Sequence, residues 1–299
     1  MSLKIAFLGT PNFSVPALRE VHKTFGVNTV FSQPPKKSNR GMKNTKSPVQ
    51  IAAEELNINV RTPINLNDDF DFFKKENFNI AVVSAYGQII SDLFLNLSNC
   101  LFINIHASIL PKWRGAAPIQ RSLMNMDQET GISIMKIKKE LDSGPVLLSK
   151  SIPLSIYSKG GEIEEQLSYL GSELIIESLN QIQSKKYNFI EQDHSKATYA
   201  KKIVKEDEMI DWNLSAEEVI AKIHALNPRP GSFFEYQNTQ LKVFKCELEK
   251  NHSGKPGEVI LDQGRMIICC KSNSINVLEI QRPGKKKQQI NEFLLGFKS

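Results

Sequence analysis

Two polar side chains at the end of one apolar run have the types and the spacing that a reactive site needs. The run LFINIHA at residues 101–107 has the composition of a short buried strand, and it carries Asn104 and His106. Side chains two residues apart on a strand point to the same face, so both groups are aimed at one spot. In an open parallel sheet, ligands bind just past the carboxyl ends of the strands, which is where this run ends. We therefore interpret Asn104 and His106 as candidate site residues rather than as packing.

The chemistry that these residues could carry is acyl transfer without a covalent intermediate. An amide N–H can stabilise a developing oxyanion, and an imidazole can give or take a proton near neutral pH. Asp142, in the run LDSG, could orient the imidazole. A lone histidine is more often structural, and an aspartate before Ser-Gly often only makes a turn. The sequence contains no serine elbow, no setting for a catalytic cysteine and no cluster of metal ligands, so the three residues together favour acyl transfer and no metal.

The elements that must position these residues alternate between strand and helix over the first 150 positions. Such alternation predicts an α/β fold with a doubly wound, Rossmann-like parallel sheet. Ser47, Pro48 and Gln50 have the spacing of a capping box at the start of a helix. The expected strands are 3–10, 27–32, 81–87 and 101–107, and the expected helices are 13–24, 68–76 and 90–97, with one more from Ser47 onward.

The pattern changes in the second half of the chain. Residues 130–154 alternate around Asp142-Ser143-Gly144-Pro145, which predicts a hairpin-like excursion. The pattern of residues 161–183 predicts a long amphipathic helix. A later helix and several short strands with Gly- or Asn-bearing turns predict a small β-barrel of the OB-like kind. The expected domains are 1–184 as the catalytic domain, 185–205 as a polar linker and 206–299 as the barrel.

Bulk composition limits the class of protein. The chain has 299 residues, 40% of them hydrophobic and 23% charged, which is globular and suits two domains. A net charge of +6 is compatible with an acidic partner. The four cysteines lack C-x-x-C spacing, so a zinc site is not expected. The N-terminus has no signal-peptide pattern and no apolar run reaches membrane length, so we expect a cytoplasmic protein without membrane contact. We also expect a monomer.

A loop from Pro34 to Lys46 concentrates positive charge. Charge runs are usually solvated surface. This loop follows the second strand at the carboxyl edge of the sheet, beside the candidate site, so it could steer a polyanionic substrate. The turn FLGTPN at 7–12 has one glycine, which favours a tight turn that shapes the pocket over a nucleotide site. The bases of the loop are Lys36, Lys37, Arg40, Lys43 and Lys46.

Over essentially its whole length the chain resembles the methionyl-tRNA formyltransferases. The run NIHASILP followed by LDSG is similar to all formyltransferases that use 10-formyltetrahydrofolate, and it indicates the reaction class. RGAAPIQ, the basic loop and the segment from DW to NPRPG are similar to the tRNA enzymes in particular. The resemblance is carried by FLGTPNFSVPAL, SPVQIAAEE, AVVSAYGQII, NIHASILPKWRGAAPIQRSL, TGISIMKIKKELDSGPVLL and IDWNLSAEEVIAKIHALNPRPGSFF.

The resemblance implies transfer of a formyl group from 10-formyltetrahydrofolate, as cosubstrate, to the α-amine of methionine on initiator tRNA. Asn104, His106 and Asp142 fall on the family's catalytic trio. Arg40 matches the loop arginine that the family uses near the acceptor end, and Lys36 and Lys43 lie in the same loop. The implied folate contacts are the stretch Ser108, Ile109, Leu110 and Pro111, and the backbone of Ala85, Tyr86 and Gly87.

Other functions remain open at this point. A formyltransferase that acts on a sugar-nucleotide amine or on a purine precursor would keep the trio but would not need a basic barrel. A hydrolase that only deformylates the folate would need no acceptor site, and an RNA-binding protein without catalysis would not need the trio. The barrel would bind tRNA phosphates through its lysines, any single one of which could be solvated surface instead. The candidate lysines are Lys201, Lys202, Lys205, Lys242, Lys245, Lys285, Lys286 and Lys287.

Overall fold

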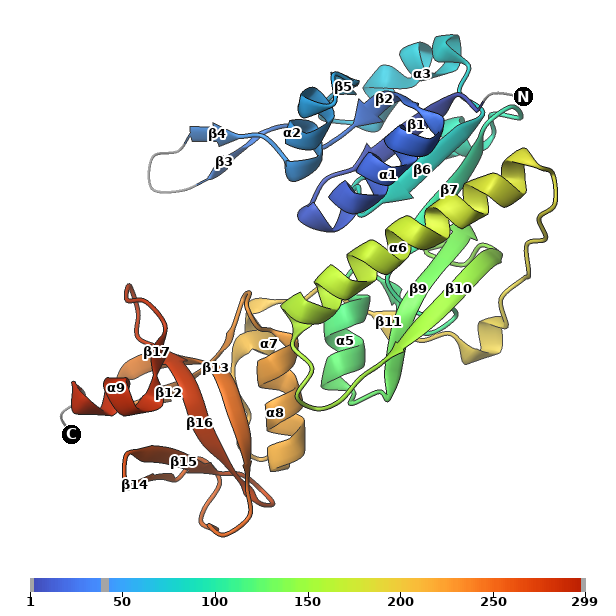
Figure 1. Cartoon of the computed structure of the whole chain (residues 1–299). Coiled ribbons are helices and arrows are strands. Elements are labelled where there is room, and N and C mark those ends of the chain that lie inside the picture. Colours follow the sequence, from blue (N-terminus) through green and yellow to red (C-terminus); the bar gives the residue numbers. More distant parts are fainter. Residues whose placement is uncertain (1–2, 39–42, 297–299) are drawn as a thin grey trace. The chain divides into compact units, whose positions relative to one another are not determined.

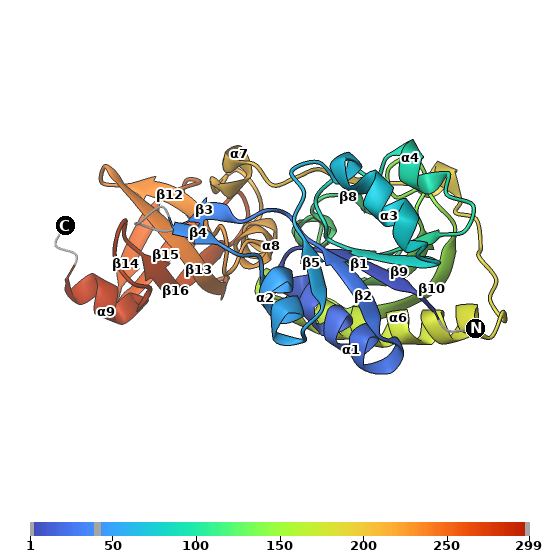
Figure 2. The ribbon, with the colours of Figure 1, turned by 90° about the horizontal axis from the view of Figure 1, so that it is seen from above.

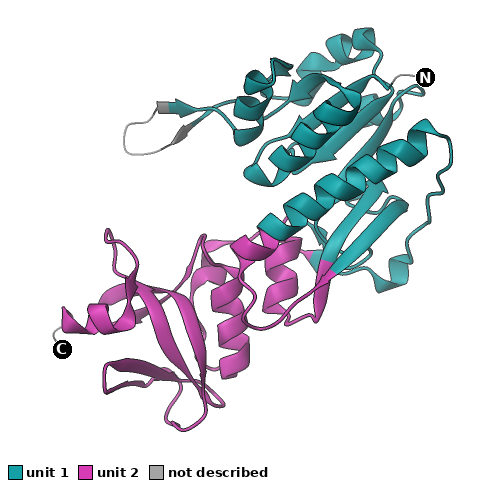
Figure 3. Cartoon of the chain, viewed as in Figure 1, with its two compact units in different colours: residues 1–115, 131–151, 165–199 teal, residues 116–130, 152–164, 200–299 magenta. Residues whose placement is uncertain are grey.

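The computed structural model describes residues 3–38 and 43–296, which fall into two compact units (Figure 1, Figure 3). Unit 1 comprises Met1–Gly115, Gly131–Ser151 and Glu165–Tyr199, and unit 2 comprises Ala116–Thr130, Ile152–Glu164 and Ala200–Ser299. The chain therefore passes between the two units several times. The domain limits expected at residues 184 and 206 stay a prediction.

The centre of unit 1 is a sheet of seven strands, counted over the described residues. β1 pairs in parallel with β2 and β6, β2 with β5, and β6 with β7, whereas β9 runs antiparallel to β7. Each apolar run that predicts a strand overlaps one of the parallel strands, and β6 begins one residue before its run. The order is β10 (Val146–Pro153), β9 (Glu129–Lys136), β7 (Leu101–His106), β6 (Ile80–Ser84), β1 (Ile5–Gly9), β2 (Val27–Phe31) and β5 (Asn59–Arg61).

Helices cover both faces of this sheet (Figure 2). On one face the ring of Phe73 packs against Phe31, Phe94 and Phe102, so apolar side chains from helix and strand share one core. A mostly parallel sheet between two helical layers confirms the predicted doubly wound fold. The helices are α1 (Val15–Phe25), α2 (Pro48–Glu55) and α6 (Gly160–Gln183) on one face and α3 (Phe70–Glu76) and α4 (Asp92–Leu95) on the other, with short 3-10 turns η1 (Asn12–Ser14), η2 (Leu66–Asp69) and η3 (His194–Lys196).

The basic segment is more ordered than a loop. β3 (Lys36–Ser38) and β4 (Lys43–Thr45) pair as a two-stranded antiparallel ribbon, so the prediction of a plain loop was wrong for these residues. The runs KKS and KNT lack apolar alternation, and their pairing comes from backbone hydrogen bonds, which leave no trace in the side-chain pattern. Arg40 lies outside the described residues.

Half of the predicted capping box is present at the start of α2. The Ser47 hydroxyl accepts a hydrogen bond from the Gln50 backbone N–H at 2.9 Å. The Gln50 side chain does not return to Ser47, because its amide donates to Glu54 at 3.0 Å, one turn further along the helix. The helix start is therefore capped by serine alone, and the reciprocal bond of the prediction was wrong.

Unit 2 is built on an antiparallel sheet, which confirms the predicted barrel-like second fold. The long strand β16 pairs with β13 on one side, and on its other side with β15 and then β17. Helix α8 packs its apolar face on β13, and its start carries a full capping box between Ser215 and Glu218. The strands of unit 2 are β12 (Ser232–Tyr236), β13 (Thr239–Glu249), β14 (Val259–Asp262), β15 (Arg265–Cys269), β16 (Ser274–Gln281) and β17 (Gln288–Gln289). Its helices are α5 (Pro118–Met124), α7 (Lys205–Glu208), α8 (Ala216–Ala225) and α9 (Ile290–Leu295). Outside this sheet, the short strand β8 (Arg114–Gly115) of unit 1 pairs with β11 (Tyr199–Ala200).

A neutral histidine is buried in the core of unit 2. His224 Nδ1 lies 3.2 Å from the carbonyl of Ile156, to which it donates, and Nε2 accepts from the backbone N–H of Cys246 at 3.4 Å. Both ring nitrogens are therefore satisfied only in the neutral form, because a second ring proton would face the Cys246 N–H. Burial lowers the pKa of His224. All four cysteines are free and buried.

This histidine makes the stability of the protein depend on pH. Its folded-state pKa lies below the unfolded value, which is about 6.5. Below about pH 6.5 His224 takes up a proton in the unfolded chain but not in the folded chain. The free energy of unfolding therefore keeps the full contribution of His224 above that pH and falls as the pH is lowered. The urea midpoint of unfolding should therefore drop between pH 7.5 and 5.5 more steeply in wild type than in His224→Gln. A His22→Gln control should keep the wild-type slope, and equal slopes in all three proteins would contradict this account.

Candidate active site

The candidate site lies where the order of the strands reverses. From β1 the chain goes first to the β2 side and later returns to β6 on the other side of β1. Gly9 at the end of β1 is paired with Ser84 at the end of β6, and Val83 is paired with Asn104 of β7. The carboxyl ends of three neighbouring strands thus share one edge. This switch point is the usual position of a ligand site in such sheets.

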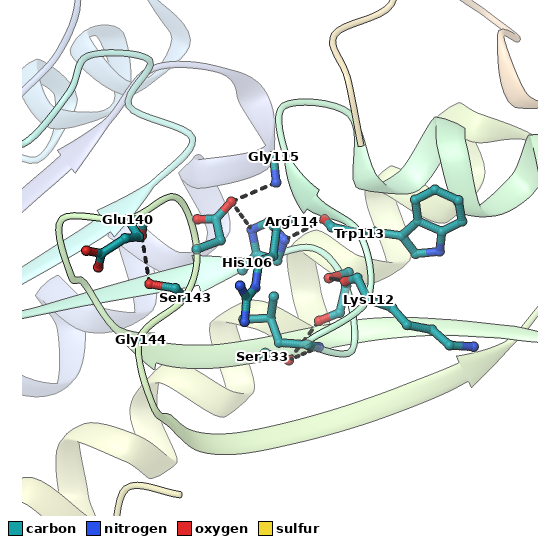
Figure 4. A network of polar contacts seen from close by, with 12 residues as sticks. His106, Lys112, Trp113, Arg114, Gly115, Ser133, Glu140, Ser143 and Gly144 are labelled. Atoms are coloured by element: carbon teal, nitrogen blue, oxygen red, sulfur yellow. Dashed lines mark hydrogen bonds and ion pairs between the residues drawn. The ribbon is translucent and has the colours of Figure 1, made fainter. Parts of the chain in front are cut away.

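His106 is held between a carbonyl and a carboxylate (Figure 4). Its side chain is buried at the end of β7, with Nε2 3.0 Å from the carbonyl oxygen of Trp113. A carbonyl can only accept, so Nε2 carries a proton and donates it to Trp113. On the other side of the ring, Nδ1 lies 3.6 Å from Oδ2 of Asp142. The structure therefore brings His106 and Asp142 together, as the sequence analysis expects.

The loop that carries Asp142 is tightly constrained. Oδ2 of Asp142 also accepts a hydrogen bond of 2.8 Å from the backbone N–H of Gly115, and the residue has φ +47°. A side chain in this left-handed region costs on the order of 1–3 kcal/mol, which the surroundings must offset. Gly144 presses against the backbone of Lys136 so closely that an added Cβ would collide with the Lys136 carbonyl oxygen. Position 144, the glycine of LDSG, therefore has no room for a side chain.

Asn104 presents an unused amide at the same edge. It is half-buried on β7, two residues before His106, so the two side chains share a face of the strand. Within residues 3–38 and 43–296 its side chain makes no hydrogen bond. The amide can thus donate to a group that enters from solution.

The stretch after β7 is pinned by Ser133 of β9. Ser133 lies opposite His106 in the strand register, and its hydroxyl donates to the carbonyl of Ser108 at 2.7 Å and accepts from the N–H of Leu110 at 3.1 Å. Ser108 in turn donates to the carbonyl of Lys112 at 2.6 Å. The half-buried residues of the expected folate stretch are thereby held beside the candidate site; they are Ile109, Leu110 and Pro111.

The backbone that follows β6 is fixed by the ends of β1 and β2. The carbonyl of Tyr86 accepts from Thr10 at 2.7 Å and from the Gln33 amide at 3.1 Å. Ala85 has φ +45° and is exposed, as is Gly87 with φ +80°. The Tyr86 side chain points into the core instead, and burial raises its pKa. Only the backbone of this segment and its exposed residues can therefore border a ligand.

One end of the basic ribbon contacts Gln33, which binds the backbone after β6. Lys36 donates to the side-chain oxygen of Gln33 at 2.6 Å, and the Gln33 amide also reaches the carbonyl of Gly87 at 3.0 Å. Lys46 forms an ion pair of 2.7 Å with Glu54, so one of the bases that looked free in the sequence has an acidic partner. For Lys43 the structure gives only its place in β4.

Several residues that shape the site carried no signal in the sequence. Ser133 and Gln33 are found only through strand register and tertiary folding. Gln192 and Thr198 lie in the segment that its polarity marks as a linker, yet they bind the loops around His106 and Asp142. Arg114 stands in RGAAP, but nothing local predicts that its guanidinium is buried.

Two kinds of feature are absent from residues 3–38 and 43–296. No group of three or more His, Cys, Asp or Glu side chains there could hold a metal ion. No helix there has the length and the hydropathy that a membrane crossing requires.

Comparison with known proteins identifies the family. Residues 3–179 match the family Formyl transferase, and residues 202–298 match Formyl transferase, C-terminal domain. The methionyl-tRNA formyltransferase of Pelagibacter ubique is 49% identical over 99% of this chain and 96% of its own length. The chain belongs to the methionyl-tRNA formyltransferase family. The protein of the same name from Parvibaculum lavamentivorans is 38% identical over 99% of this chain and 97% of its own length.

The fold is also shared with a solved structure. The N-formyltransferase from Helicobacter canadensis, in complex with folinic acid and dTDP-3-aminofucose, superposes with a TM-score of 0.70. It is 18% identical and covers 94% of this chain and 99% of its own. At that identity the likeness shows the fold alone. The two family matches, not this likeness, identify both parts of the chain as those of a formyltransferase.

Proposed function

We propose that this formyltransferase moves the formyl group of 10-formyltetrahydrofolate to the α-amine of methionine on initiator tRNA. The observation that carries the proposal is 49% identity, over 99% of the chain, to a protein named methionyl-tRNA formyltransferase. The sugar-nucleotide alternative is not favoured, because the N-formyltransferase in complex with dTDP-3-aminofucose shares 18% identity and only the fold. A folate cosubstrate is supported by the family and by the folinic acid bound to that structure.

In the proposed reaction the amine nitrogen attacks the formyl carbon and the carbonyl oxygen becomes an oxyanion. The free amide of Asn104 would donate to that oxyanion. The amine then loses a proton, the bond between the carbon and the folate nitrogen breaks, and that nitrogen gains a proton. His106, with Asp142 beside Nδ1 at 3.6 Å, is the group that would stabilise the charge and move these protons.

The folate would lie along the same edge of the sheet. Its contacts would be Ser108–Pro111, which Ser133 holds in place, and the backbone at Ala85–Gly87. Both segments are fixed by hydrogen bonds to the protein, so they would meet the cosubstrate with little rearrangement.

The tRNA would bind through exposed cations. Lys242 is engaged, because it donates to the carbonyl of Pro230 at 2.7 Å and lies 3.7 Å from Glu208, and Lys287 lies over the ring of Phe244. The remaining lysines proposed for phosphate contact are exposed: Lys201, Lys202, Lys205, Lys245, Lys285 and Lys286.

A panel of acceptors tests the proposed substrate. Enzyme and 10-formyltetrahydrofolate would be mixed with charged initiator tRNA, with free methionine and with a sugar-nucleotide amine, and formylated product would be measured. The proposal expects fast product on the charged tRNA and background on the others. Faster formylation of the sugar amine would overturn it.

The basic segment from Pro34 to Lys46 gives a prediction about how the acceptor is positioned. A guanidinium can grip a phosphate or a base edge at two points, whereas an ammonium is a point charge. Arg40→Leu should therefore lower the single-turnover rate on charged tRNA strongly and Arg40→Lys should restore it only in part. Lys36→Ala and Lys43→Ala should each cause milder losses that depend on salt. Measured at two salt concentrations, equal salt-sensitive losses at all three positions would show that Arg40 has no special role.

A further inference from the structure

The segment 190–198, here called the strap, binds both loops that orient the catalytic pair. At one end Ile190 exchanges two backbone hydrogen bonds of 2.8 Å with Val146, which begins β10 just after the Asp142 loop. At the other end Thr198 accepts from the N–H of Trp113 through its hydroxyl at 2.9 Å and from the N–H of Arg114 through its carbonyl at 2.9 Å. The carbonyl of Trp113 is the acceptor of His106 Nε2. The strap therefore ties the His106 side of the site to the Asp142 side.

Gln192 lies within the strap, and both the nitrogen and the oxygen of its side-chain amide form hydrogen bonds. The side chain is buried, and its Nε2 donates to the carbonyl of Asp142 at 2.9 Å and to that of Gly144 at 2.6 Å. Its Oε1 accepts from Nε and Nη2 of Arg114 at 3.1 and 2.7 Å. The same Nη2 donates to Nδ1 of His194 at 2.8 Å, which holds the buried guanidinium in place.

This arrangement has a direct effect on the geometry of Asp142. One amide group draws the carbonyls on both sides of Ser143 toward a single point, which fixes the turn in which Asp142 takes its left-handed φ of +47°. The cationic Arg114 polarises the amide from the far side and so strengthens both of the hydrogen bonds that it donates. We propose that Gln192 is a positioning residue for the reaction, which acts through Asp142 and is itself oriented by Arg114. The inference rests on the proposed role of Asp142.

A double-mutant cycle tests it on the full-length enzyme. Gln192→Glu keeps the shape and the acceptor for Arg114, but its ionised carboxylate cannot donate to the two carbonyls. A misplaced catalytic group costs on the order of 100-fold in rate, so we expect Gln192→Glu to lower the single-turnover rate by about 10- to 100-fold. KM for the tRNA and for the folate should stay within about twofold, because no substrate contact is lost. In an Asp142→Ala background the same change should have almost no further effect.

A conservative variant at position 192 and a matched control on α6 distinguish a positioning role from general damage to the fold. Gln192→Asn keeps the amide but cannot reach both carbonyls, so it should show a smaller loss that also vanishes without Asp142. Gln181→Glu makes the same chemical change on α6 and serves as the control. The neighbouring Ile182 lines a pocket with Ile80 and Leu101, which begin β6 and β7, so position 181 lies at the end of the strands opposite to the site. The control should keep the wild-type rate. Hydrogen exchange should quicken at residues 112–116 and 140–146 in Gln192→Glu, and not in the control.

The outcomes separate this inference from the function on which it rests. A wild-type rate for Asp142→Ala would contradict the proposed role of Asp142 and remove the basis of the inference. A slow Asp142→Ala enzyme combined with a wild-type rate for Gln192→Glu, or with losses that simply multiply in the double variant, would overturn the positioning role alone.

Discussion

Replacing His106 with alanine should lower the rate of formyl transfer by about 100- to 10 000-fold, the range that general acid–base groups contribute. The side chain is buried between the Trp113 carbonyl and Asp142, and alanine places no group there that can give or take a proton. Its removal should leave the affinity for charged tRNA nearly unchanged, because the imidazole acts at the reacting centre. Single-turnover rates and tRNA binding would be measured side by side.

A matched histidine outside the site controls for general damage. His22 lies on α1, where its Nδ1 accepts from the N–H of Val27 at 3.2 Å, and His22→Ala should keep the rate of transfer. A folded His106→Ala enzyme with wild-type turnover would remove this residue from the mechanism.

Replacing Asn104 with aspartate should be at least as damaging as replacing it with alanine. The alanine variant loses one donor to the oxyanion, which typically costs about 100- to 1000-fold in rate. The aspartate variant also places a negative charge where negative charge develops, so its transition state is destabilised further. Because the amide makes no hydrogen bond within the described chain, neither change should disturb the fold.

The order of the two variants is the informative result. Both rates would be measured at saturating folate and tRNA, together with thermal unfolding as a check on structure. An Asn104→Asp enzyme that is faster than Asn104→Ala would mean that the side chain does not face the oxyanion.

Local pattern was enough to predict much of this structure. The two-residue spacing of Asn104 and His106 on an apolar run places them on one face, and strand alternation follows from backbone geometry alone. Alternating strands and helices likewise predict the doubly wound sheet. The turn chemistry of LDSG indicates a tight loop, and the structure adds that Gly144 must lack a Cβ because of Lys136.

What the sequence could not predict depends on contacts between distant residues. Gln192 meets Asp142 from 50 positions away, and its polar surroundings are typical of a linker. Ser133 becomes part of the site only because β9 pairs with β7 in one register. The ribbon of β3 and β4 is held by backbone pairing, which a run of lysines, serine, asparagine and threonine does not reveal.

The measurement that tests the central claim most directly is the fate of one labelled formyl group. Enzyme in excess would be mixed with charged initiator tRNA and 10-formyltetrahydrofolate labelled in the formyl carbon, and the products would be followed by mass spectrometry. We expect one labelled formyl on the α-amine of methionine for each folate consumed, and a rate that falls by at least about 100-fold in His106→Ala. Release of the label as free formate without formylated tRNA, or equal rates in the two enzymes, would contradict the account.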